Sequence, residues 1–156
     1  MLVATAPLQI EKCSVEIVSE MRLPLVDRFY KECKYRVKCG RLDRVYTLNY
    51  EARIIAAARL ISLPLQQNSD YLLLRNLCVL PFMRHQGAAK HLLKSIVTQL
   101  HPISCYCFAL PHLQDFYLSL NFRVLYSHEV PVELGAIYER DAARGRGWIL
   151  MGYCAL

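Results

Sequence analysis

The sequence predicts a single domain of the α/β or α+β class, built around a mixed sheet. Segments of strand length alternate with stretches whose apolar residues recur at helical spacing. One strand-length segment, Tyr71–Val79, is apolar almost throughout, which is typical of a strand buried on both faces. The chain has 156 residues, 54% hydrophobic and 21% charged, so it is long enough and apolar enough to bury one core.

The first part of the chain predicts a strand followed by a helical region. Residues 13–19, "CSVEIVS", resemble a strand, and apolar positions from about residue 20 to 38 fall at helical spacing. Gly40 breaks this pattern, as the C-terminus of a helix does. We predict two helices here, and then two strands, Arg44–Tyr50 and residues 53–63, joined by a tight turn.

The clearest predicted helix follows Gly87. Its apolar residues form one stripe, while lysines and a glutamine lie off that stripe. The helix should stop at His101, because a proline follows. The stripe consists of Ala89, Leu92, Leu93, Ile96, Val97 and Leu100.

The last third of the chain alternates strands and helices. A helix over residues 111–120 has Asn121 after it, which can take the left-handed conformation that ends a helix. The other predicted elements are strands over residues 103–110, 122–127 and 147–154 and a helix over residues 131–143. The whole order is β-α-α-β-β-β-α-β-α-β-α-β.

Composition restricts the environment and the partners. The seven cysteines include no CxxC pair, and no secretion signal or apolar run of membrane length accompanies them, so we expect reduced, buried thiols, a cytoplasmic location, no metal and no membrane partner. A formal net charge of +6 fits nucleic acid or an anionic cofactor equally well. No basic tail or RNA-binding aromatic signature favours nucleic acid.

The stretch "RNLCVLPFMRHQGAAKHLL" places a glycine-centred basic turn between a buried strand and a helix. The first N–H groups of a helix have no partner inside it and can donate to a phosphate. Gly87 lets the backbone approach closely, Ala88 and Ala89 keep the first turn small, and Arg84 adds positive charge. The turn therefore predicts a phosphate site for a nucleotide-like cofactor, although it matches neither a Walker loop nor a dinucleotide fingerprint.

Two motifs resemble the GNAT superfamily of N-acetyltransferases. Val79, Pro81, Arg84, Gly87 and Ala89 spell V-x-P-x-x-R-x-x-G-x-A, which is similar to that family's motif A. Downstream, "DFYLSLNFRVL" resembles its F-Y-x-x-x-G-F segment, with an asparagine in the glycine place. The resemblance covers most of the chain from about residue 13. It implies one GNAT-like domain over residues 1–156, with a mixed, mostly antiparallel sheet of about six to seven strands flanked by helices.

The resemblance also implies a donor and a site. Acetyl-CoA would supply the acetyl group, and an amine of a small molecule, peptide or protein would attack its thioester directly. Tyr117, in the family's tyrosine position, would protonate the leaving thiolate. The backbone of Leu77, Cys78 and Val79 would pair with the pantetheine arm. The backbone amides holding the pyrophosphate would be those of Arg84, His85, Gln86, Gly87, Ala88 and Ala89.

The chain departs from the family where a general base often stands. Leu73, Leu74 and Arg75 occupy that region, and none can act as a base. His112 could replace it or lie on the surface, and Arg75 could bind a substrate carboxylate or face solvent. An asparagine often found before the tyrosine segment is missing too, since Leu110 and a proline stand there.

The acceptor site of such a domain lies between the early helices and the final loops. Candidates to line it are Phe29, Tyr30, Tyr35, Glu129, Glu133, Tyr138 and Glu139. A CoA-binding module that senses without turnover is the alternative to an enzyme, and a nucleic-acid-binding protein is a third hypothesis. The apolar final strand could also lie at a sheet edge and pair with a second copy of the chain in a homodimer.

Overall fold

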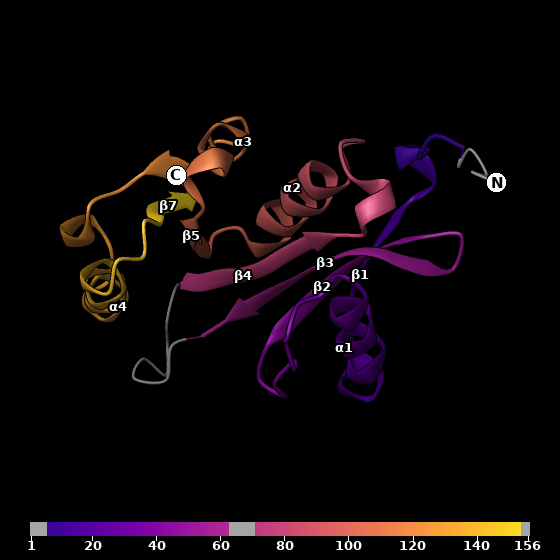
Figure 1. The fold of residues 1–156 in the computed structure, drawn as a ribbon, viewed down its shortest axis with the longest axis horizontal. Helices are drawn as coiled ribbons and strands as arrows, with labels where there is room; N and C mark the ends of the chain where they lie inside the picture. Colours follow the sequence, from indigo (N-terminus) through magenta and orange to yellow (C-terminus); the bar gives the residue numbers. More distant parts are fainter. Residues whose placement is uncertain (1–5, 63–70, 154–156) are drawn as a thin grey trace.

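A computed structural model describes residues 6–62 and 71–153 of the chain. Within these residues seven strands form one sheet in the order β1-β2-β3-β4-β5-β7-β6 (Figure 1). Among the described strand pairs only β4 and β5 are parallel, so the prediction of a mixed, mostly antiparallel sheet is confirmed. The strands are β1 Ser14–Ile17, β2 Arg44–Tyr50, β3 Arg53–Ile61, β4 Tyr71–Val79, β5 Ser104–Ala109, β6 Arg123–Val124 and β7 Ile149–Tyr153.

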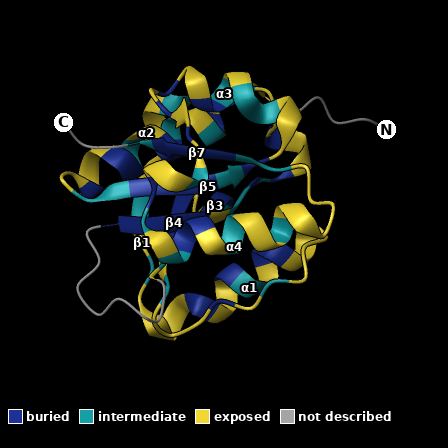
Figure 2. Cartoon of the chain, turned by 90° about the vertical axis from the view of Figure 1, so that its left-hand side faces the viewer, coloured by how far each residue is buried: buried dark blue, intermediate teal, exposed yellow. Residues whose placement is uncertain are grey.

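Four α-helices within the described residues cover the two faces of the sheet: α1 Leu23–Glu32, α2 Ala88–Leu100, α3 Gln114–Leu118 and α4 Val132–Ala143. α2 and α3 lie on one face, and α1 and α4 lie on the other (Figures 1 and 2). α2 buries its predicted apolar stripe against the sheet except for Ala89, which is half-buried while Ala88 is buried in its place, and the helix ends before His101, as expected. No helix in the described ranges is long and apolar enough to cross a membrane.

The prediction for the first helical region is partly wrong. α1 ends at Glu32, and no second α-helix forms before β2; the short 3₁₀ turn Glu20–Arg22 leads directly into α1. Lys34 takes the left-handed conformation (φ 63°) in place of a glycine, and the N–H of Tyr35 donates back to the carbonyl of Tyr30 at 2.9 Å. The Asp27 carboxylate of α1 accepts a hydrogen bond from the N–H of residue 39 at 2.8 Å, so the segment after α1 is held against the helix.

The expectation for the final strand is also wrong. β7 pairs with β5 on one side and with β6 on the other, so it lies inside the sheet and not at its edge. The edges are β1 and the two-residue β6. Strand order depends on contacts between distant segments, which the apolar pattern of one strand does not encode. The last predicted strand residue, Cys154, lies outside the described residues.

Five of the six cysteines in the described part of the chain are buried, as predicted. Six are described, all are free thiols, and Cys13 is the one of them that is half-exposed. Cys105 and Cys107 both point into the core from one face of β5.

Candidate functional site

The sheet splits between β4 and β5. The two strands pair from Tyr71 to Leu74 on β4, opposite Ser104 to Cys107 on β5, and β4 then departs from its neighbour. The cause is a bulge in β4: Ala57 of β3 faces Cys78, but Arg59 faces Arg75, so β4 carries one more residue over this interval than β3. A cleft of about 280 Å³ opens at the split.

Asn76 forms the bulge with a left-handed backbone (φ 57°), a conformation that asparagine tolerates better than most residues with a Cβ. Its carbonyl accepts from the Tyr30 hydroxyl at 2.7 Å, and its Oδ1 accepts from Arg59 Nη1 at 2.9 Å. Arg59 is in turn paired with Asp43, whose Oδ2 lies 2.7 Å from Nη2. These hydrogen bonds come from α1, β3 and the loop between α1 and β2, so they fix the bulge from three sides.

The cleft passes through the sheet, with different side chains on each side. On the face of α3, Tyr117 lies beside Cys107, and Leu113 packs against the same core. On the face of α1 and α4, the ring of Tyr35 meets Tyr30 of α1, and Phe108 stacks with Trp148 at 6.0 Å between ring centres. The lining consists of Tyr35, Leu74, Arg75, Asn76, Leu77, Cys107, Phe108, Ala109, Leu110, Leu113, Tyr117 and Trp148.

Tyr117 is the candidate proton donor. Its side chain is 6% exposed, and its hydroxyl forms a hydrogen bond with the Cys107 thiol. Burial away from water raises the pKa of the Tyr117 phenol well above its ordinary value, and the neighbouring thiols of Cys107 and Cys105 raise it further. A phenol with a raised pKa stays protonated at neutral pH, so this group can donate a proton into the cleft.

The turn between β4 and α2 exposes backbone donors. No described residue accepts from the N–H groups of His85, Gln86 and Gly87, and the first N–H groups of α2 have no partner inside the helix. His85 and Gly87 are both left-handed, with φ 63° and 87°. A Cβ on Gly87 would have no atom within 4 Å, so the backbone is open to a ligand at this point. The geometry fits a phosphate group, as the turn sequence predicts.

Two side chains hold the turn in place. Arg84 Nε donates to the carbonyl of Val79 at 3.1 Å, which closes the loop from the strand end to the helix start. Gln86 Oε1 accepts from the N–H of Leu8 at 2.7 Å, so the N-terminal segment rests against the turn. Arg84 thus holds the backbone of the turn, and the residue as a whole is exposed.

The structure brings some of the predicted residues to the cleft and leaves others away from it. Leu77 and Tyr117 line it, whereas Cys78 and Val79 lie beyond its lining toward the turn. Of the residues at the usual base position, Leu74 and Arg75 line the cleft, and Leu73 packs on the side of α4.

Most acceptor candidates have structural roles instead. Tyr35 alone of that group lines the cleft. The Tyr138 hydroxyl donates to the carbonyl of Trp148 at 3.0 Å, while Glu129 caps a short turn and Glu139 accepts from a serine. His112 is exposed and does not line the cleft.

Sequence reasoning missed Asn76, Phe108 and Trp148. An asparagine inside an apolar strand is a usable signal for a left-handed bulge residue. Nothing local distinguishes Phe108 or Trp148 from core aromatics, because β5 and the start of β7 meet only in the folded sheet.

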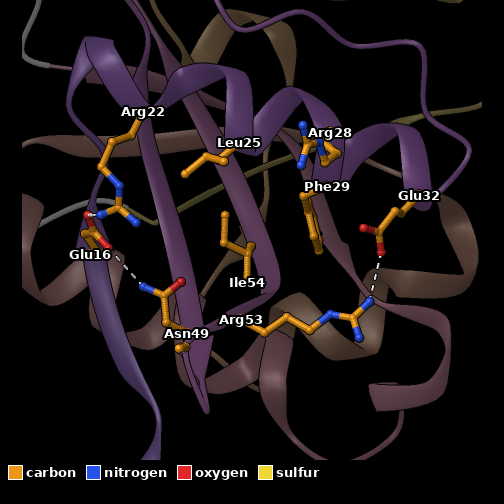
Figure 3. Close-up of a pocket in the computed structure, with 10 residues that line it drawn as sticks. Glu16, Arg22, Leu25, Arg28, Phe29, Glu32, Asn49, Arg53 and Ile54 are labelled. Atoms are coloured by element: carbon orange, nitrogen blue, oxygen red, sulfur yellow. Dashed lines mark hydrogen bonds and ion pairs between the residues drawn. The ribbon is translucent and has the colours of Figure 1, made fainter.

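A larger groove, of about 510 Å³, lies elsewhere, between α1 and the ends of β1 to β3 (Figure 3). Leu25, Phe29 and Ile54 lie along its middle. Ion pairs stand at its two ends, Arg22 with Glu16 and Arg53 with Glu32. Its carboxylates are therefore already paired, and it lies away from the split strands and Tyr117.

No three His, Cys, Asp or Glu side chains gather into a metal-binding group in the described part of the chain. No protein-family model and no curated protein matches the chain.

Solved structures, in contrast, match the fold over most of the chain. N-acetylglutamate synthase from Neisseria gonorrhoeae, complexed with coenzyme A and N-acetyl-glutamate, aligns with 90% of this chain at a TM-score of 0.66 and 15% identity. The match covers 34% of that enzyme, so this chain spans about a third of its length.

Two other solved structures align with most of this chain and with most of their own length. The ribosomal-protein-S18-alanine N-acetyltransferase from Escherichia coli aligns with 92% of this chain and 95% of its own, with a TM-score of 0.63 and 14% identity. An acetyltransferase of the GNAT family from Staphylococcus aureus aligns with 77% and 90%, with a TM-score of 0.55 and 14% identity. Together with the split sheet and the glycine turn, these matches show that the chain has the fold of the GNAT acetyltransferases.

Proposed function

We propose that this protein transfers an acetyl group from acetyl-CoA to a primary amine by direct attack. The observation that carries the proposal is a single continuous arrangement. The split between β4 and β5 opens a cleft with Tyr117 in its wall, and the exposed N–H groups of the β4–α2 turn lie past the end of the same strand. Solved proteins of this fold, including the gonococcal enzyme, hold coenzyme A.

The donor would lie along this path. The pyrophosphate would accept from the backbone N–H groups between Arg84 and Ala89, at the positive end of α2. The pantetheine arm would continue along β4, at the position where β5 no longer supplies a pairing partner. Leu77 borders the cleft on this strand, and Cys78 and Val79 lead from it to the turn.

The reaction forms one covalent bond, C–N, and breaks another, C–S. The nitrogen lone pair of a neutral amine attacks the thioester carbonyl, the C–N bond forms, and the C–S bond breaks. The thiolate takes the proton of the Tyr117 hydroxyl, and the amide nitrogen releases its extra proton to solvent. Solvent then reprotonates Tyr117. A positioned acid of this kind contributes about 10²- to 10⁴-fold to a rate.

One observation favours a second function, a CoA sensor without turnover. No Asp, Glu or His lines the cleft among the described residues, so no side chain there can serve as general base. Such a sensor would bind acetyl-CoA and release no thiol with any amine.

The test compares Tyr117→Phe with the wild type in acetyl-CoA binding and in thiol release with a panel of amines. The control is Tyr126→Phe, because Tyr126 is 69% exposed and lies outside the cleft. We expect Tyr117→Phe to bind acetyl-CoA as the wild type does and to lose about 100-fold or more in rate. Equal rates would refute the role of Tyr117, and binding without any turnover by the wild type would establish the sensor.

A further inference from the structure

We propose that the acceptor is an amine that carries its own carboxylate, and that Arg75 binds this carboxylate. The inference rests on the proposed function and specifies the substrate class of the same cleft. It follows from the charge of the lining, the position of Arg75 and the wall beside it.

The lining of the cleft contains one charged side chain among the described residues, the guanidinium of Arg75. An acceptor with several ammonium groups would meet no carboxylate there and would be repelled by Arg75. A carboxylate, in contrast, matches the planar fork of a guanidinium and can accept two hydrogen bonds from it. The lining therefore selects for an anionic group on the acceptor.

Arg75 faces the side of the sheet that α1 and α4 cover. Tyr71 and Leu73 pack in one cluster with Leu134 of α4, and side chains two residues apart on a strand share a face. Arg75 therefore points to the face of α1 and α4. Tyr117 reaches the same cleft from the opposite face, with α3.

The neighbouring charges leave Arg75 unpaired. Its cross-strand partner is Arg59, which is held by Asp43 with Nη2 at 2.7 Å and Nε at 3.1 Å from the same oxygen. No described residue forms an ion pair or hydrogen bond with the Arg75 side chain. Asp43 thus neutralises one of the two arginines, and the other presents its charge to the cleft.

A flat aromatic wall, made of Phe108 on β5 and Trp148 just before β7, lines the same cleft as Arg75. Trp148 stacks on Phe108 with 12° between the ring planes, and the guanidinium of Arg146 lies 5.3 Å from the centre of the Trp148 ring. The Tyr138 hydroxyl also holds the Trp148 carbonyl. A fixed apolar wall beside an arginine suits an acceptor with an apolar or aromatic substituent next to its carboxylate.

The contact between Arg75 and the substrate carboxylate also explains how the reaction can proceed without a general base in the cleft. In a free amino acid the carboxylate favours the charged form of the adjacent amine, and a nearby cation disfavours it. Once Arg75 neutralises the carboxylate, the amine loses its proton to solvent more easily. The neutral nucleophile can then form without a basic side chain in the cleft.

The test uses pairs of acceptors that differ by the carboxylate alone. One pair is L-phenylalanine and phenethylamine. The second is the peptide amides Glu-Ala-Ala and Gln-Ala-Ala, which present the carboxylate on a peptide. Thiol release gives kcat/KM for wild type, Arg75→Gln and Arg75→Lys, and acetyl-CoA binding is measured for each. Arg123→Gln is the control, because this exposed arginine on β6 does not line the cleft.

We expect the wild type to favour the carboxylate-bearing member of one pair by about 10- to 100-fold, the usual effect of a hydrogen bond to a charged group. Arg75→Gln should abolish that preference while acetyl-CoA binding stays unchanged, Arg75→Lys should keep part of it, and Arg123→Gln all of it. A preference in the first pair identifies a small amino acid, and one in the second identifies an acidic peptide N-terminus.

Equal rates within both pairs, or a preference for phenethylamine that survives in Arg75→Gln, would overturn the inference and leave the proposed function standing. If the wild type does not bind acetyl-CoA, the proposed function itself is refuted.

Discussion

Replacement of Asn76 tests how the chain builds its cleft. Asn76→Ala removes the acceptor of the Arg59 hydrogen bond. It also places alanine, which tolerates a left-handed backbone less well than asparagine, at φ 57°. A hydrogen bond to a charged group contributes about 1.5–3 kcal/mol, and a left-handed backbone costs a residue with a Cβ about 1–2 kcal/mol. The Arg59 side chain is 18% exposed and Asn76 is half-buried, so solvent screens this hydrogen bond only in part. Asparagine bears part of the backbone cost already, so we expect the free energy of unfolding to fall by about 1.5–5 kcal/mol, between the hydrogen bond alone and the full sum.

Asn76→Gly separates the two contributions. Glycine loses the same hydrogen bond but adopts the left-handed backbone without strain. Glycine should therefore be less destabilising than alanine at this position. In ordinary strands the ranking is the opposite, and glycine is the less stable of the two by about 0.5–1 kcal/mol. The same two substitutions at Asn49 of β2, whose φ is not positive, are the control and should keep the ordinary order. Urea unfolding measures all four variants, and an Asn76→Ala variant more stable than Asn76→Gly would refute the reasoning.

Three further predictions concern the site and the core. Tyr30→Phe removes the hydrogen bond to the bulge carbonyl. It should lower the free energy of unfolding in urea by about 0.5–1.5 kcal/mol and raise the KM for acetyl-CoA in steady-state assays. Tyr126→Phe, at an exposed tyrosine, is the control and should change neither quantity. Because burial raises the pKa of Tyr117, its acid form persists as pH rises. The pH profile of kcat/KM should therefore climb as the amine becomes neutral and show no descending limb below about pH 10; a fall near pH 8 would contradict this. Burial raises the pKa of the Cys33 and Cys105 thiols to about 12, so iodoacetamide at neutral pH should leave both unmodified until urea unfolds the protein, as mass spectrometry of peptides would show.

The turn and the core of the fold could be predicted from the sequence because their signals are local. A buried strand, a glycine turn and an amphipathic helix occupy consecutive residues, and the structure places Arg84 and Gly87 between β4 and α2 as that pattern requires. The C-terminus of α1 was missed because Lys34 takes a conformation for which glycine is the usual signal.

The lining of the cleft could be predicted only in part. Tyr117 follows from a motif, but the bulge at Asn76 depends on Tyr30 and Arg59, which lie 46 and 17 residues away along the chain. Trp148 reaches the cleft only because β7 pairs with β5 in the interior of the sheet. Such contacts are set by tertiary packing, which no local pattern specifies.

The central claim is that acetyl-CoA binds with its phosphates on the turn at Gly87. Titration calorimetry with acetyl-CoA tests it directly on wild type, Gly87→Asp and Gly145→Asp. The two glycines match, with φ 87° and 83° and no atom within 4 Å of an added Cβ, and aspartate tolerates this backbone. The account predicts saturable binding by wild type and Gly145→Asp and none by Gly87→Asp, whose carboxylate would repel the pyrophosphate. Equal binding by both variants, or no binding by the wild type at millimolar ligand, would contradict it.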